Sequence, residues 1–199
     1  MAAGFTLGGD IKDSGFAASE FKAAGLGPSD LHTAGFSASE LSAAGFTLGE
    51  LKTAGLPASK LMAAGCTASD LKAVGFAPAE LRAAGFTARD LGAARFTASD
   101  FKAAGFPVLE HKAAGFTAQQ LKAAGFVLYE VMAAGFSHDE AILAGFSASE
   151  FKAVGFTARE LKEFGFKVHE LKAAGFLPAE LKVADFTAPE LKIAGFLID

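Results

Sequence analysis

The sequence predicts an all-α solenoid of short helices, one for each ten-residue repeat, running as a single continuous unit over residues 1–199. Three observations predict this fold. A ten-residue pattern recurs along the whole chain, most copies carry the start and stop signals of a helix, and every proline falls where the first turn of a helix tolerates it.

The repeat reads F-[ST]-A-S-E-L-K-A-A-G when each copy is counted from its phenylalanine. Phe136, Phe146 and Phe156 open three consecutive copies. Glycine closes 17 of 19 copies, and the exceptions are Arg95 and Asp185. Because no low-complexity linker or shift in composition divides the chain, we expect one repeat array rather than separate domains.

The beginning of each copy has the pattern of a capping box. In TASD, Thr97 to Asp100, the threonine hydroxyl can accept from the fourth residue's N–H while the carboxylate reaches back to the cap. An acid occupies the fourth place in 17 of 19 copies, where the helix dipole favours negative charge. The closing glycine suits a left-handed C′ residue, and the next phenylalanine then falls at C″ of a Schellman motif.

The prolines support the same helix boundaries. Because a helix does not use the N–H groups of its first turn, proline is accepted there. Pro28, Pro78 and Pro178 fall at the first helical position, Pro57 and Pro107 at the cap, and Pro189 one place further in.

A helix of about seven residues is too short to persist alone in water, so the copies must stack. In one copy Ala158, Leu161 and Phe164 form the apolar stripe expected to face the core. Arg159 and Lys162 lie on the face expected to be exposed to solvent. We expect about four helices per superhelical turn. A zigzag of paired helices is the alternative packing.

Leucine and phenylalanine also alternate every five residues, as in AGFTA and SELKA. In this respect the chain resembles the pentapeptide-repeat family. The resemblance implies a different fold, a right-handed quadrilateral β-solenoid whose large apolar residues point inward. The helical fold accounts better for the inequivalent halves of each ten-residue copy, because prolines occur in one half only.

Composition limits the partners. The chain has 18 Lys and Arg against 22 Asp and Glu, a net charge of -4, and no basic tract, so we expect no binding to nucleic acid. Residues 1–10 lack the features of a signal peptide, and acidic residues interrupt every apolar stretch. We therefore expect a soluble, intracellular protein without membrane insertion. The single Cys66 fits this location.

Signatures of enzymes are missing from the sequence. It has no zinc-type Cys or His spacing, no P-loop and no G-x-S-x-G elbow. We expect no catalytic residues, cofactor, metal or small-molecule substrate. His111 takes an inward leucine position and is expected in the core, and His138 is expected in a solvated first turn.

The copies that break the pattern are the candidate binding residues. Tyr129 and Met132 replace polar residues, as does Met62, and are candidate anchors for a partner. Ile142 and Leu143 follow Ala141, which replaces the core leucine. They either rotate inward to refill the core or extend an exposed apolar patch. The candidates for end-to-end stacking are Phe5, Phe196, Leu197 and Ile198.

We therefore expect a non-enzymatic structural or scaffold protein that mediates protein–protein contacts or assembles end to end. The pentapeptide-repeat resemblance implies an alternative, a DNA-mimicking inhibitor of a topoisomerase, although lysines offset most of the acidic charge. A third possibility is an ice- or surface-binding protein, because threonines such as Thr87, Thr97 and Thr117 recur in register.

Overall fold

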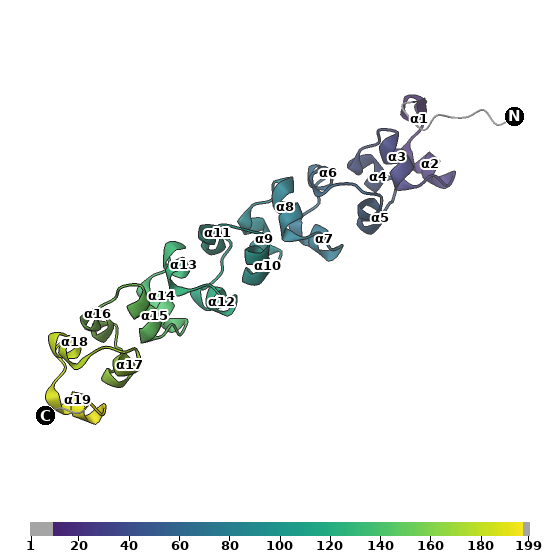
Figure 1. Cartoon of the computed structure of the whole chain (residues 1–199). Helices are drawn as coiled ribbons and strands as arrows, with labels where there is room; N and C mark the ends of the chain where they lie inside the picture. The colour runs from purple at the N-terminus through teal and green to yellow at the C-terminus, as the bar shows by residue number, and fades with distance from the viewer. Residues whose placement is uncertain (1–9, 197–199) are drawn as a thin grey trace. The chain divides into compact units, whose positions relative to one another are not determined.

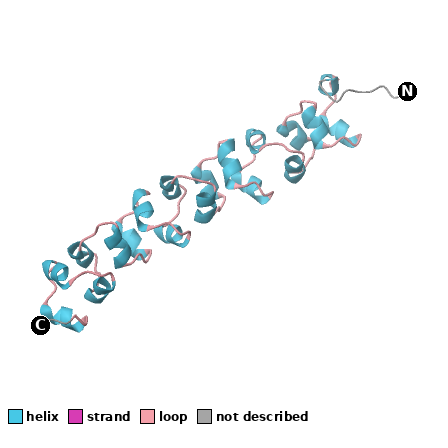
Figure 2. Ribbon diagram, in the orientation of Figure 1, coloured by secondary structure: helices cyan, strands magenta, loops and turns pink. Residues whose placement is uncertain are grey.

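The structure, a computed structural model, describes residues 10–196, and all regular elements in that range are short α-helices (Figures 1 and 2). The first ten are α1 (Asp10–Asp13), α2 (Ala18–Ala23), α3 (Pro28–Thr33), α4 (Ala38–Ala43), α5 (Leu48–Thr53), α6 (Ala58–Ala63), α7 (Ala68–Ala73), α8 (Pro78–Ala84), α9 (Ala88–Ala93) and α10 (Ala98–Ala103). The others are α11 (Val108–Ala113), α12 (Ala118–Ala123), α13 (Leu128–Ala133), α14 (His138–Leu143), α15 (Ala148–Ala153), α16 (Ala158–Glu163), α17 (Val168–Ala173), α18 (Pro178–Val183) and α19 (Ala188–Ile193).

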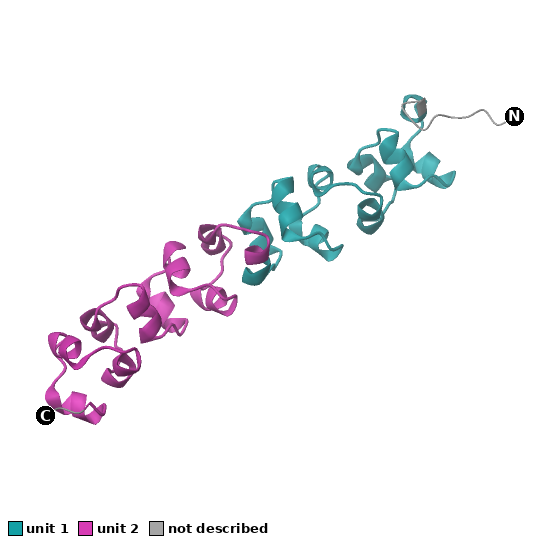
Figure 3. Ribbon diagram, in the orientation of Figure 1, with its two compact units in different colours: residues 1–100 teal, residues 101–199 magenta. Residues whose placement is uncertain are grey.

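The predicted solenoid of short helices is confirmed, with one helix per ten-residue copy. The alternative β-solenoid is wrong, because residues 10–196 contain no strand. The chain divides into two compact units, residues 1–100 and 101–199 (Figure 3). Each unit is described by itself below, and the single continuous array stays a prediction.

The helices begin at the predicted capping boxes. In α7, the Thr67 hydroxyl accepts from the Asp70 N–H at 3.2 Å, and the Asp70 carboxylate accepts from the Thr67 N–H at 2.9 Å. Where the cap has no hydroxyl, half of the box remains: the Glu130 carboxylate still accepts from the Val127 N–H at 2.9 Å. The carboxylate thus satisfies a backbone donor at the cap with or without its threonine partner.

The helices end in the predicted Schellman motif. After α7, the Phe76 N–H donates to the Leu71 carbonyl at 3.0 Å, and the Gly75 N–H donates to the Lys72 carbonyl at 2.8 Å. Gly75 has a φ of 87°, which glycine adopts without steric penalty. Arg95 and Asp185 replace this glycine and keep the left-handed turn, each with a φ of 60°.

The core of each unit is built mainly from the first, third and sixth residues of the copies. Leu61 and Leu161 are fully buried, and Ala158 is nearly so. Helices pack on the next helix, as α3 does on α4, and on the next but one, as α6 does on α8 and α12 on α14. The number of helices per superhelical turn and the zigzag of paired helices stay predictions.

Candidate protein-binding surface

Ten lysine side chains lie over phenylalanine rings that follow 24 residues later. Each Nζ atom is 4.3–5.4 Å from its ring centroid. The lysines are Lys12, Lys22, Lys52, Lys72, Lys102, Lys112, Lys122, Lys152, Lys162 and Lys172. We call each contact a lysine–phenylalanine pair.

The same ammonium groups bond to the C-terminal ends of helices two places along the chain. Lys102 Nζ donates to the Gly125 carbonyl at 2.6 Å, and Lys72 Nζ donates to the Arg95 carbonyl at 2.6 Å. Carbonyls at a helix C-terminus lack intrahelical donors, and the dipole there favours a cation. Each pair therefore links two copies by a charge-assisted hydrogen bond and a cation–π contact.

Nearly all phenylalanines that a lysine covers are buried. Of the ten covered rings, those from Phe36 to Phe186 are buried, and Phe196 is half-buried. Four other phenylalanines that open a copy are only half-buried, and a residue other than lysine stands 24 places earlier. They are Phe86, Phe116, Phe156 and Phe166, preceded at that distance by Met62, Gly92, Met132 and Ile142. The lysine stem shields the ring while its ammonium reaches the carbonyl.

The sequence carries this 24-residue signal, which the ten-residue period does not reveal by itself. The phenylalanine position is Leu56 in one copy and Cys66 in the next. The residues 24 places before them are His32 and Ser42, so lysine is missing where the aromatic ring is missing. A search for correlated positions within the repeats would have found the pairs.

Met62 occupies the path that lysine takes elsewhere. Its Cε and Sδ atoms lie 3.7 and 3.8 Å from the position of a Cβ built on Gly85, next to Phe86. Its side chain is 38% exposed. Met62 therefore lies close to the turn at Gly85, and its role as an anchor for a partner stays a prediction.

The other candidates separate into exposed and half-buried residues on α13 and α14. Tyr129 is 70% exposed and Leu143 is 85% exposed, whereas Met132 and Ile142 are half-buried. Ala141 is fully buried. The prediction that Leu143 rotates inward to refill the core is thus wrong. Ala141 keeps the core position, and Leu143, two residues later on the same helix, faces solvent. The two helices pack against each other.

Further apolar side chains of unit 2 are exposed, although the repeat pattern did not single them out. They are Leu109, Val127, Val154, Leu177, Val183 and Ile193. The sequence does not single them out, because each is an isolated substitution at a normally small or polar position and leaves the core pattern of its copy intact. Large apolar side chains on polar helix faces are the features that protein partners use most often.

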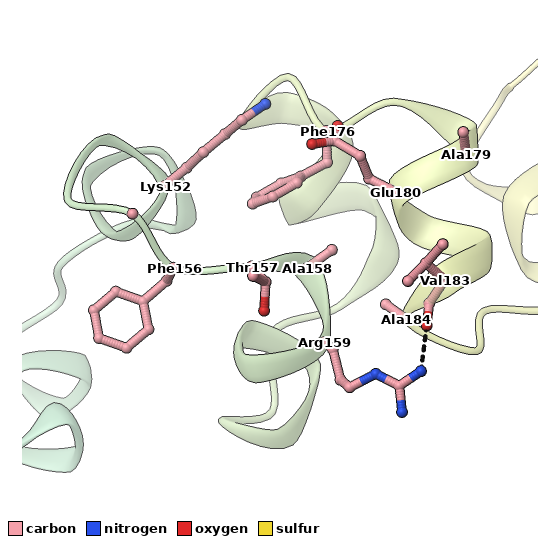
Figure 4. Close-up of a pocket in the computed structure, with 11 residues that line it drawn as sticks. Lys152, Phe156, Thr157, Ala158, Arg159, Phe176, Ala179, Glu180, Val183 and Ala184 are labelled. Carbon is pink, nitrogen blue, oxygen red and sulfur yellow. Dashed lines mark hydrogen bonds between the residues drawn. The ribbon is translucent and has the colours of Figure 1, made fainter.

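One of these side chains, Val183, lines a groove in unit 2 (Figure 4). It has a volume of about 710 Å³ and is lined by Phe156, Phe176 and Val183 among others. Arg159 lies at its edge, where it donates to the Val183 carbonyl and pairs with Asp185 at 3.2 Å. Corresponding residues of another copy, including Phe116, Phe136 and Leu143, line a second groove of about 410 Å³.

The end-stacking candidates are mostly beyond the described range. Phe5, Leu197 and Ile198 lie outside the described residues. Phe196 is half-buried, and the Lys172 ammonium lies 4.8 Å from its ring centroid. One side of this ring is therefore already engaged within unit 2.

The titratable groups serve the helix ends. The backbone N–H of Thr47, followed by its hydroxyl, lowers the pKa of Glu50, and burial raises the pKa of the Cys66 thiol.

Among residues 10–196, no group of three His, Cys, Asp or Glu side chains is placed to hold a metal ion. No described helix has the length and apolar character needed to cross a bilayer.

Two histidines pack against aromatic rings. The buried His111 lies in the core as expected, with Nδ1 3.1 Å from the Pro107 carbonyl. His138, expected in a solvated turn, is half-buried with its ring 4.8 Å from Phe156 and 5.0 Å from Phe164. The bulky Phe164, which stands where most copies carry alanine, supplies one of the surfaces that cover it.

Comparison with known proteins identifies the repeat. The family model of the decapeptide repeat region matches residues 4–78, 65–138 and 128–198 in tandem. The resemblance to the pentapeptide-repeat family is not confirmed by this match. Neither the curated proteins nor the solved structures contain a match to the chain.

Proposed function

Because the chain belongs to the decapeptide repeat family, we propose that it is a non-enzymatic scaffold that mediates protein–protein contacts or assembles end to end. In this array, most polar side chains form hydrogen bonds at the caps of their own helices, and most lysines contact later copies. The residues left over for a partner are the apolar side chains that face solvent.

The observation that carries the proposal is the exposure of Tyr129 and Leu143. Most copies place serine or another small residue at the position of Tyr129, and alanine at the position of Leu143. Neither side chain is needed by the core, which Val131 and Ala141 already complete. Tyrosine and large aliphatic residues contribute strongly to protein interfaces once a partner removes them from water.

End-to-end self-assembly is the second form of the proposal. Phe196 and the following Leu197 and Ile198 are apolar, so a second copy could extend the repeat stacking through a head-to-tail contact. Such a contact joins different surfaces of the two copies, so it can propagate.

Light scattering after size-exclusion chromatography tests the proposal over a wide range of protein concentration. We expect the mass of the unaltered chain to rise with concentration, and to rise less when Tyr129→Ser and Leu143→Ala are combined. Leu177→Thr, which removes another exposed apolar side chain of unit 2, is the matched control. A monomer at every concentration would exclude self-assembly and direct the search to a different protein bound at Tyr129 and Leu143.

The two alternative functions have weaker support. A DNA mimic needs a strongly negative surface, and ten of the lysines form pairs throughout the array. An ice-binding row needs free hydroxyls, but groups such as Thr87 Oγ1 both accept from and donate to the acid of the same cap, here Asp90. A topoisomerase inhibition assay and a thermal-hysteresis assay would test them.

A further inference from the structure

We propose that α1 and α2 of unit 1 receive α18 and α19 of a second copy of this chain, and that Lys182 and Lys192 of that copy bind at the turns after α1 and α2. We call the surface of α1, α2 and their turns the receiving edge, and the surface of α18 and α19 the donating edge. This inference rests on the end-to-end form of the proposed function and names the two surfaces that meet.

The receiving edge exposes aromatic side chains at positions that are covered in other copies. Phe21 holds the core position of α2 and is only half-buried, whereas the corresponding residue is buried in every other described copy. Phe16 is 57% exposed, and its ring contacts Phe21 with centroids 6.0 Å apart. Since the copies of a solenoid bury their apolar faces against neighbouring copies, a further copy is the partner that suits this surface.

Lys12 shows within unit 1 how a turn of this kind binds a lysine. Its Nζ donates to the Gly35 carbonyl at 2.7 Å and to the Glu40 carboxylate at 2.9 Å, and it lies 5.4 Å from the Phe36 ring centroid. The turn thus brings together a helix-terminal carbonyl, an aromatic face and a carboxylate. All three groups favour a cation.

The same three groups occur at Gly15, Phe16 and Glu20 without a lysine. Gly15 has a φ of 82°, in the left-handed region that Gly35 also adopts with a φ of 97°. Among residues 10–196, no side chain donates to the Gly15 carbonyl, and no ion pair involves the Glu20 carboxylate. That carboxylate accepts from the Ala17 N–H at 2.8 Å, which holds it at the cap beside the turn.

The charges of the receiving edge favour a cation from outside. The ammonium groups of Lys12 and Lys22 already donate to carbonyls of later turns. In the part of the chain that the structure describes, the carboxylates of Glu20 and Asp30 have no cationic partner. A lysine placed at either carboxylate therefore gains an ionic contact that the chain does not supply itself.

Lys182 on α18 and Lys192 on α19 are suited to these places. Each directly follows the core residue of its helix, as all ten paired lysines do. Both side chains are exposed, and within residues 10–196 neither lies over a ring or bonds to a carbonyl. The ammonium groups are therefore available to a second molecule.

The spacing of the two lysines matches that of the two turns. Lys182 and Lys192 are ten residues apart, as are the turns after α1 and α2. When Lys182 binds at Phe16, Lys192 reaches the turn after α2, where Leu26 takes the place of the ring. The half-buried Phe196 adds apolar surface to the donating edge. Because the two edges differ, the contact is head-to-tail and can propagate.

A mixing experiment tests the junction in full-length chains that all carry Tyr129→Ser and Leu143→Ala. These two substitutions remove the contacts of the other proposed surface, and we call this chain the parent. Light scattering after size-exclusion chromatography should show that the mass of the parent rises above 20.3 kDa as its concentration increases.

Two blocked variants of the parent each lose one edge. The first adds Phe16→Ser and Glu20→Lys, and the second adds Lys182→Glu and Lys192→Glu. Each alone should stay a monomer at concentrations where the parent assembles. An equimolar mixture keeps one intact junction between the two variants, so it should stop at a dimer of twice the single-chain mass.

Lys60→Glu combined with Lys167→Glu is the matched control. It changes the net charge as much as the donating-edge variant does, at exposed lysines outside both edges, and should assemble like the parent. The helix α6 forms with Lys60 at the place that Glu20 takes in α2, so Glu20→Lys is compatible with the helix. Should the receiving-edge variant lose its circular dichroism signal at 222 nm, Glu20→Lys alone takes its place in the mixture.

Each negative result would overturn the proposal in a recognisable way. Assembly of the donating-edge variant to the mass of the control would show that Lys182 and Lys192 are not involved. A mixture that stays monomeric while the parent assembles would exclude this junction but keep self-assembly. A parent that stays monomeric while the unaltered chain assembles would refute this inference and leave the proposed contacts of Tyr129 and Leu143 intact.

Discussion

Lys72 offers the sharpest test of the lysine–phenylalanine pairs, because both partners lie in unit 1. Its Nζ donates to the carbonyls of Ala94 at 3.1 Å and Arg95 at 2.6 Å, and lies 4.5 Å from the Phe96 ring centroid. Lys72→Met removes the charge but keeps an apolar stem, as Met62 does naturally over Gly85.

The expected loss follows from the two contacts. A cation over an exposed aromatic ring contributes about 0.5–1 kcal/mol. A cation at a helix C-terminus contributes about 0.3–1 kcal/mol. Lys72→Met should therefore lower the free energy of unfolding by about 1–2 kcal/mol. Lys72→Ala should cost roughly 0.5–1 kcal/mol more, because it also uncovers part of the Phe96 ring.

Urea denaturation followed by circular dichroism at 222 nm measures these differences. Lys182→Met is the matched control, since Lys182 has the same position on α18 and makes no lysine–phenylalanine pair among the described residues. It should change the free energy of unfolding by less than about 0.5 kcal/mol. If Lys72→Met cost no more than this control, the pairs would be incidental to stability and the reasoning would be refuted.

Three further predictions concern single positions. His111→Leu should stabilise the protein by about 1–3 kcal/mol in the same denaturation assay, because His111 Nε2 is buried without a partner and the Pro107 carbonyl keeps the Glu110 N–H as a donor. Arg95→Gly should raise the melting temperature, since relief of the left-handed φ of 60° is worth about 1 kcal/mol and exceeds the cost of glycine flexibility. The Ser37 N–H, with Lys12, lowers the pKa of Glu40 from 4.5 to about 2, so its stabilising contribution is complete above pH 4.5 and is lost as the pH falls towards 2. Glu40→Gln, in which the amide oxygen can still cap the helix, should show a smaller loss of stability over that pH range, and an unchanged pH profile would contradict this role.

Only part of the exposed apolar surface could be predicted from the sequence. The substitutions at Tyr129 and Leu143 stood out because they break a short, regular pattern. The exposure of Leu143 depended on which of Ala141, Ile142 and Leu143 faces the core. Packing against neighbouring helices, and not helix propensity, places the small Ala141 there. The groove beside Phe156 could not be predicted at all, because residues some 20 positions apart form its walls.

The sequence by itself determined the local structure of each copy. The hydroxyl of Thr67, the carboxylate of Asp70 and the left-handed Gly75 act within about ten residues of one another, so their roles follow from spacing alone. Only the tertiary structure decided that helices stack on the next but one and that Lys72 covers Phe96. Contacts of this kind depend on how turns direct successive helices, and six-residue helices acquire their stability from that packing rather than from their own hydrogen bonds.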